Sequence, residues 1–343
     1  MTSFLRSDRS RAVSLWLFLV AAMVLAMVVV GGATRLTGSG LSITQWKPLS
    51  GVLPPLSPGD WAREFAGYRA IPQFRLLNPH MSLDQFKTIF WWEWSHRLLA
   101  RVLGLVFLVP FAWFAVRREI PSRLWGQMGA ITLICALEPL VGWWMVASGL
   151  ADRVHVAPER LTLHLGIAMA LLGALVWTAL DAAAGSARQT LPSPWGGRAV
   201  GLVVLVYIQI LLGALVAGNH AGRIYNDWPL FNGHLLPQDY AGEGLWDTLA
   251  HSQGAVQLHH RVVAYLLAAV ALTIGVGAAR SRYLPPASKI LVLSAAALVG
   301  AQLCLGVATL MAVTPIGLGM AHQLTAALLL CVAVAFAWRV RRV

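Results

Sequence analysis

The chain has 343 residues, of which 58% are hydrophobic and 12% are charged. Soluble domains carry about 25% charged residues, so the composition excludes an ordinary soluble protein and indicates an integral membrane protein. The formal net charge of +12 is not evidence for nucleic-acid binding, because the basic residues lie in short segments between apolar runs.

Eight apolar runs are each long enough to cross a hydrocarbon core of about 30 Å as a helix. The first run, 14–32, contains no charged residue. Its length, and the lack of a small-residue cleavage pattern after it, predict a retained helix rather than a cleaved signal peptide. The other predicted spans are 97–116, 124–147, 161–180, 199–217, 260–279, 290–311 and 320–338.

Basic residues are concentrated at the termini and in every second connection between the predicted spans. These residues are Arg6, Arg9, Arg11, Arg117, Arg118, Arg123, Arg188, Arg198, Arg280, Arg282, Lys289, Arg339, Arg341 and Arg342. The positive-inside rule places these segments in the cytoplasm. The connections 33–96, 148–160, 218–259 and 312–319 are then outside. With no evident transit peptide, we expect a multi-pass protein of a bacterial inner membrane.

The two halves of the chain resemble each other. The segment 93–97, Glu-Trp-Ser-His-Arg, opens the second span, and 257–261, Gln-Leu-His-His-Arg, opens the sixth. Each half has four spans, so both enter the membrane with the same orientation, related by an axis along the membrane normal. We therefore expect an all-α polytopic membrane protein of two pseudo-symmetric four-helix bundles, formed by residues 1–185 and 186–343.

Four histidines stand at the outer ends of spans 2, 4, 6 and 8: His96, His164, His260 and His322. One interfacial histidine is more often a polar cap than a ligand, but ionisable groups in membrane spans are costly and usually functional. Four histidines at one depth, in repeated contexts, favour metal ligation. Separated pairs without a third ligand favour haem iron, held at both axial positions, over zinc.

The other histidines have weaker claims. His259 lies about 100° around the helix from His260. The loop histidines are expected to be solvated: His80, His155, His220, His234 and His251. The three cysteines, Cys135, Cys304 and Cys331, all fall inside predicted spans, so no outer disulfide is available and cysteine redox chemistry is not expected.

Four arginines lie near the histidines: Arg35, Arg97, Arg101 and Arg261. An arginine there can hold haem propionates through charge-assisted hydrogen bonds, or it can simply extend its head group to the membrane surface. The sequence leaves both interpretations open for Arg97 and Arg261. Arg101 lies one helical turn deeper than Arg97, which favours a functional role.

Two acidic residues need an explanation. Glu93 shares a helix face with His96, and apolar neighbours would raise its pKa towards a useful range for an acid or base. Gln257 takes its place in the other half, which indicates that only one half performs chemistry. The alternative is a solvated glutamate at a helix N-terminus. Glu138 lies deeper, with Gln302 at the matching place, and is expected to be a hydrogen-bonded packing residue.

Several longer motifs resemble those of the haem A synthase family. They are GGATRLTGSGLSITQWKP (31–48), NPHMSLDQFK (78–87), IFWWEWSHRLLAR (89–101), GWWMVASGL (142–150), RLTLHL (160–165), LLGALVAGNHAGRIYNDWP (211–229), QLHHR (257–261), LGVATLMAVTP (305–315) and AHQ (321–323). The resemblance runs from about residue 14 to 338. The chain resembles the branch that lacks an outer-loop cysteine pair. It departs from the family pattern at Ala100, at Glu138-Pro139, where Gln-Gly is expected, and at Asp227.

The resemblance implies oxidation of the C8 methyl group of haem O to a formyl group, giving haem A for terminal oxidases. It assigns His96 and His164 to the haem O site, with Glu93 as the essential acid. It assigns His260 and His322 to a haem b cofactor. Partners implied are haem O synthase and cytochrome oxidase assembly factors within the lipid bilayer, but no nucleic acid.

Two other functions compete with this interpretation. A bis-histidine dihaem cytochrome, exchanging electrons with quinone, explains the histidine pairs equally well but not the difference between Glu93 and Gln257. A transporter built from two repeats explains the symmetry but predicts no bound haem.

Overall fold

The computed structural model describes residues 2–48, 50–184 and 193–341. Within these ranges the regular elements are helices, apart from one isolated bridge between Phe231 and His234. Eight of the helices are long and apolar enough to cross a membrane, which confirms the predicted all-α polytopic class. The expected topology residues Arg188 and Arg342 lie outside the described ranges.

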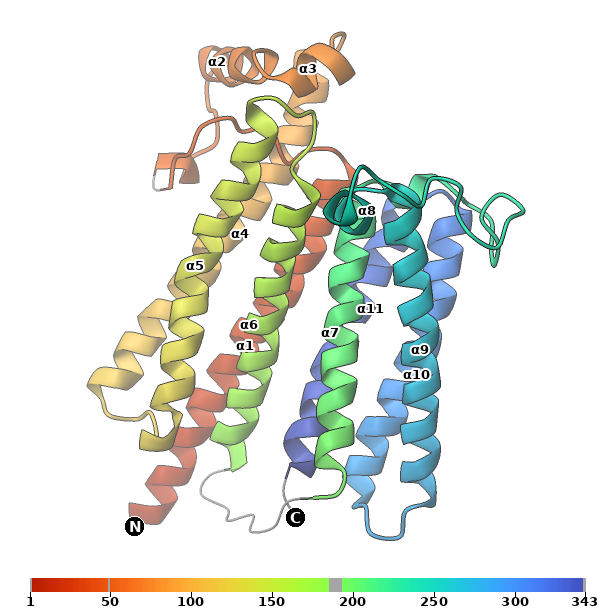
Figure 1. Ribbon diagram of the computed structural model, residues 1–343. Helices are drawn as coiled ribbons and strands as arrows, with labels where there is room; N and C mark the ends of the chain where they lie inside the picture. Colours follow the sequence, from red (N-terminus) through yellow and green to blue (C-terminus); the bar gives the residue numbers. More distant parts are fainter. Residues whose placement is uncertain (1, 49, 185–192, 342–343) are drawn as a thin grey trace.

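The eight long helices are α1 (Thr2–Leu36), α4 (Leu83–Val116), α5 (Trp125–Leu150), α6 (Pro158–Ala184), α7 (Gly196–Gly218), α9 (Gln253–Arg280), α10 (Pro286–Met311) and α11 (Ile316–Val340). The shorter elements are η1 (Ser50–Val52), α2 (Pro58–Arg69), α3 (Pro72–Leu77), η2 (Ser122–Leu124), η3 (Ala221–Arg223) and α8 (Leu245–Ala250). The short helices α2, α3 and α8 lie at one end of the bundle, and both marked chain ends lie at the other (Figure 1).

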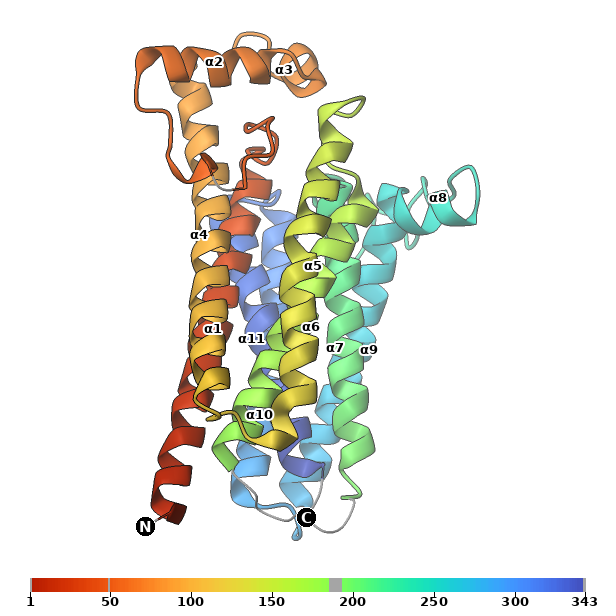
Figure 2. The same ribbon diagram turned by 90° about the vertical axis from the view of Figure 1, so that its left-hand side faces the viewer.

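The long helices form two groups that pack side by side (Figures 1 and 2). In the first group α1 packs on α4 and α6, and α5 packs on α6. The second group closes into a ring, because α7 and α10 each contact both α9 and α11. Between the groups, α6 contacts α7 and α11, and α1 contacts α11. The assignment of separate roles to the two halves remains a prediction.

The first outer connection is more ordered than the sequence indicated. Helix α4 begins at Leu83 rather than near residue 97, and α2 and α3 precede it. Ser82 starts α4 with a capping box: its hydroxyl accepts from the Gln85 amide, and the Gln85 side chain accepts from the Ser82 amide. At 34 residues, α4 is about 51 Å long and rises well above a hydrocarbon core of about 30 Å.

An apolar cluster explains why α4 extends outward. The face of α4 formed by Phe86, Ile89 and Phe90 is buried against Tyr68 and Leu41. These α4 positions recur at helical spacing, so one stripe of the helix is covered although the segment also carries charges. We call residues 37–82 together with the start of α4 the outer cap. Within the cap, the segment 37–48 lies against α4, and we call this segment the strap.

Candidate functional site

The four paired histidines lie inside helices rather than at their first residues. His164, His260 and His322 come about two turns after α6, α9 and α11 begin, and His96 about four turns after α4 begins. The sequence placed them at the helix starts because charged and polar residues precede each apolar run. In the structure those residues extend the helices outward.

In the second helix group, His260 and His322 face each other. Their ring centroids are 6.5 Å apart and their planes make an angle of 76°. Two imidazoles that bind opposite faces of one metal ion at about 2 Å place their centroids about 6 Å apart. A Cβ atom added to Gly213 or Gly306 would lie 3.1 Å from Cε1 of His260 or His322, respectively. The rings therefore pack directly against glycine backbone, and their spacing fits a bis-histidine haem.

The first helix group has the same glycine contacts. A Cβ atom on Gly31 would lie 3.1 Å from Nε2 of His96, and one on Gly142 would lie 3.1 Å from Cε1 of His164. His96 and His164 are close enough to interact electrostatically. His164 has a further partner, since its Nδ1 lies 2.6 Å from Oε2 of Glu138. Glu138 was not among the expected site residues.

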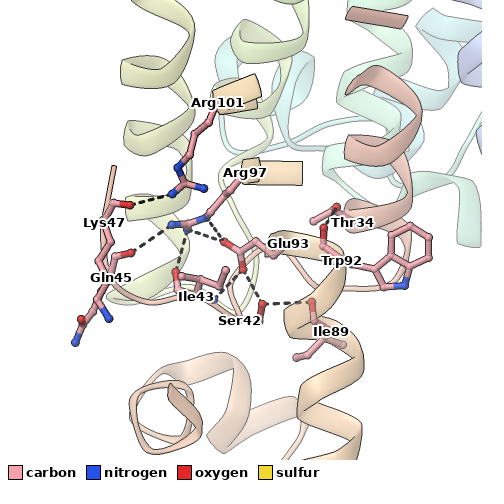
Figure 3. Close-up of polar contacts among 10 residues, drawn as sticks. All are labelled: Thr34, Ser42, Ile43, Gln45, Lys47, Ile89, Trp92, Glu93, Arg97 and Arg101. Carbon is pink, nitrogen blue, oxygen red and sulfur yellow. Dashed lines mark hydrogen bonds and ion pairs between the residues drawn. The ribbon is translucent and has the colours of Figure 1, made fainter. Parts of the chain in front are cut away.

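Glu93 lies at the centre of a hydrogen-bond network that joins α4 to the strap (Figure 3). Its side chain is buried, with 2% exposure. Oε2 accepts from the Ser42 hydroxyl and the Ile43 amide, both at 2.8 Å. Oε1 accepts from Nε and Nη2 of Arg97 at 3.0 and 2.6 Å. The structure thus excludes the solvated glutamate at a helix end that the sequence left open.

The arginines on α4 bind backbone carbonyls of the strap. Arg97 donates to the carbonyls of Ile43 and Gln45, at 3.0 and 3.3 Å. Arg101 donates to those of Lys47 and Pro48, both at 2.9 Å (Figure 3 shows the Lys47 contact). These contacts fix the strap along two turns of the helix that carries His96. The Nη1 atom of Arg101 is buried without a protein partner.

The second helix group repeats this arrangement with an amide in place of the carboxylate. Oε1 of Gln257 accepts from Nη2 of Arg261 at 2.6 Å, and Nε2 of Gln257 donates to the carbonyls of Ala221 and Ile224. Arg261 is only 8% exposed and binds four further carbonyls, those of Tyr225, Asp227, Pro229 and Leu230. We call 221–230 the second strap. The burial of Arg261 excludes the alternative in which its side chain only extends to the membrane surface.

Arg35 lies where the two halves meet on the outer side. Its Nη2 donates to the carbonyl of Ala217 at 2.7 Å and lies 2.8 Å from Nε2 of His220. The His220 ring contacts that of His155, with centroids 4.3 Å apart and planes tilted by 48°. His155 and His220 are therefore partly buried, and the prediction that they are solvated was wrong for both. Burial, followed by the charge of Arg35, lowers the pKa of His155 and takes that of His220 to about 3.

A repeated signal in the sequence pointed to the residues that were missed. Glu138 and Gly142 have the same spacing on α5 as Gln302 and Gly306 on α10. In both helices the glycine contacts a paired histidine, and the polar residue reaches the same histidine one turn away. The sequence had already matched Glu138 to Gln302, and extending that comparison by one turn would have identified the two glycines as well.

Within the described residues, no group of three or more His, Cys, Asp or Glu side chains could hold a metal ion. The paired histidines and their hydrogen-bond networks instead form two similar sites, one in each helix group, each with one histidine pair and one strap. The fold and these sites define a polytopic membrane protein with a pair of histidines at equivalent places in each half.

Comparisons with known proteins agree with this description. A family model described as cytochrome oxidase assembly protein matches residues 14–334. The chain is 58% identical to the heme A synthase of Caulobacter sp. (strain K31) and 59% identical to that of Caulobacter vibrioides, each over 100% of both chains. It is 47% identical to the heme A synthase of Maricaulis maris, over 98% of both chains. The chain therefore belongs to the haem A synthase family.

Proposed function

We propose that this chain oxidises the C8 methyl group of haem O to a formyl group, which produces haem A. The observation that carries the proposal is the match to heme A synthases over the whole length of the chain, combined with a histidine pair in each half. We place the protein in a bacterial inner membrane, with both sites towards the periplasm. The basic connections at the opposite end support this orientation.

We assign the second half to a resident haem b, whose iron His260 and His322 would hold. The centroid spacing of 6.5 Å supports this assignment, as do the glycines that keep both rings in place. Arg261 is assigned to a haem propionate. Its Nε atom is buried and has no protein partner, so one charge-assisted hydrogen bond is still available there.

The first half is assigned to haem O, with His96 and His164 on the iron. When bound, the iron supplies the redox chemistry. We assign the propionates to Arg35, Arg97 and Arg101. Nε of Arg35 and Nη1 of Arg101 are buried donors without a protein partner, which supports the assignment for these two.

Glu93 is assigned as the acid or base of the reaction. It precedes His96 by one helical turn and is excluded from bulk water. Arg97 and the strap donors hold its carboxylate in one orientation, which preorganises the group. A proton exchanged with the substrate would have to displace one of these donors, so catalysis by Glu93 couples to movement of the strap.

The test is pigment analysis in cells that make haem O but have no haem A synthase of their own. Expression of this chain should produce haem A, and His96→Ala or His164→Ala should abolish it. Two low-spin haems without any haem A would overturn the proposal in favour of a dihaem cytochrome. We further propose that haem O synthase delivers the substrate and that cytochrome oxidase assembly factors receive the product.

The orientation has its own test. Leu56 is 77% exposed in the cap, and Tyr283 is 94% exposed between α9 and α10. In a cysteine-free background, Leu56→Cys should react with a membrane-impermeant maleimide from the periplasm, whereas Tyr283→Cys should react only after cell lysis. The reverse pattern would refute the orientation.

A further inference from the structure

Helix α5 carries an acidic side chain, Glu138, that contacts a histidine on the neighbouring helix α6. We propose that the carboxylate of Glu138 fixes the His164 ring and strengthens it as a ligand to the iron of the substrate haem. On this proposal Glu138 is a positioning residue that acts through His164. The inference rests on the proposed function, because it takes His164 to be a haem ligand.

The geometry holds the His164 ring from two directions. Oε2 of Glu138 lies 2.6 Å from Nδ1, and the two side chains are 15% and 23% exposed, respectively. One turn further along α5, Gly142 lies so close that a Cβ atom there would be 3.1 Å from Cε1. With Nδ1 engaged by the carboxylate, Nε2 is the nitrogen left for the iron.

The matching residue in the second half makes a different contact. Gln302 occupies the place of Glu138, one turn before Gly306. Its Nε2 donates 2.8 Å to the backbone carbonyl of His322 rather than to the ring. The carboxylate contact to a paired histidine is therefore present in the first half and replaced by a backbone contact in the second.

This difference has a chemical consequence. A ligating histidine that donates its other N–H to a carboxylate is a more basic ligand with a fixed ring orientation. A more basic ligand stabilises ferric iron relative to ferrous iron. Loss of such an outer partner typically weakens metal affinity by about 10–100-fold. For a one-electron couple, each tenfold change in the ratio of ferric to ferrous binding constants shifts the midpoint potential by about 59 mV.

The position of Glu138 within a predicted membrane span also requires an explanation. Ionisable groups at this depth are costly and are usually paired or functional. Oε2 of Glu138 lies 2.6 Å from Nδ1 of His164, and neither carboxylate oxygen has another protein partner, so His164 is the contact that accounts for the residue. If Glu138 only had to make a polar contact with the neighbouring helix, glutamine would serve equally well, as Gln302 does between α10 and α11.

The test uses Glu138→Gln, with Gln302→Ala as the matched control in the other half. Haemin, ferric protoporphyrin, is the probe, added to full-length protein purified from cells without haem O. Binding to the first half should weaken by about 10–100-fold in Glu138→Gln, and the midpoint potential of that haem should rise by about 59 mV per tenfold change. Gln302→Ala should leave the affinity and potential of the first-half haem unchanged.

His164→Ala distinguishes a failure of the proposed ligation by His164 from a failure of the role proposed for Glu138. If His164→Ala retains both low-spin haem spectra, the proposed ligation itself fails. If it loses one spectrum while Glu138→Gln keeps wild-type affinity and potential, only the role of Glu138 is overturned. Should Glu138→Gln not accumulate, Glu138→Asp moves the carboxylate back by one methylene and should shift the same haem in the same direction. An unshifted haem in Glu138→Asp would then overturn the inference.

Discussion

The Glu93 network gives a prediction that does not depend on catalysis. In Glu93→Gln, one carboxylate oxygen becomes an NH2 group. If that group faces Ser42 and Ile43, it meets two donors and loses both hydrogen bonds. If it faces Arg97, it meets the guanidinium instead. In either orientation the buried site has unpaired donors, and the strap should detach from α4 more easily.

The magnitude follows from the contacts that are lost. Hydrogen bonds to charged groups contribute about 1.5–3 kcal/mol each, so losing two costs about 3 kcal/mol or more. Because 1.4 kcal/mol is a factor of ten, the strap should open about 100-fold more often. Hydrogen–deuterium exchange measures this at the Ile43 amide, whose proton is donated to Glu93.

The second half supplies the control. Gln257 donates to two carbonyls, those of Ala221 and Ile224, so its amide matches its partners where an amide at position 93 would not. Gln257→Glu should loosen only the second strap, and Glu93→Gln only the strap 37–48. If Ile43 keeps its exchange protection within about threefold in Glu93→Gln, the reasoning from the donor pattern is wrong.

Three further predictions concern other contacts. Gly142→Ala and Gly306→Ala should each reduce haem occupancy in their own half, measured by pyridine haemochrome, because the added methyl group would lie 3.1 Å from a histidine ring; full occupancy in both would contradict this. Asp181→Asn should lower the free energy of unfolding by about 1–3 kcal/mol in detergent, because this carboxylate joins α6 to α11 through Trp338 and Arg341; an unchanged unfolding curve would argue against it. The lowered pKa of His220 favours its neutral form in the folded state, so stability should be constant above about pH 6.5 and fall as the pH drops towards 3; a wild-type pH dependence of the melting temperature in His220→Gln would refute this.

The sequence predicted the eight membrane-spanning helices well, because hydrophobic length is a local property. The orientation inferred from the alternating positive charge remains a prediction. It also identified the four histidines, since each stands next to a long apolar run and the context repeats. The family resemblance was confirmed over nearly the whole chain. Roles in ligation and catalysis remain predictions.

The sequence was less informative where long-range contacts decide the structure. The strap is fixed by bonds from Arg97 and Arg101 to carbonyls about fifty residues earlier in the chain, and backbone acceptors have no sequence signature. His155 and His220 looked like ordinary loop residues, but they meet because the two halves pack together. Glu138 looked like packing because its partner lies on the next helix, at a depth that hydropathy alone does not resolve.

Helix α4 connects the aqueous cap to the membrane interior as a single rod. Its one proline, Pro110, comes about four turns after His96, so no break separates the cap from the histidine. Kinks occur mainly at prolines and similar breaks, so a displacement of α2 or α3 is expected to be transmitted along α4 to the segment that carries His96. Movement of the cap would in this way reach the segment that carries His96 without any direct contact to its side chain.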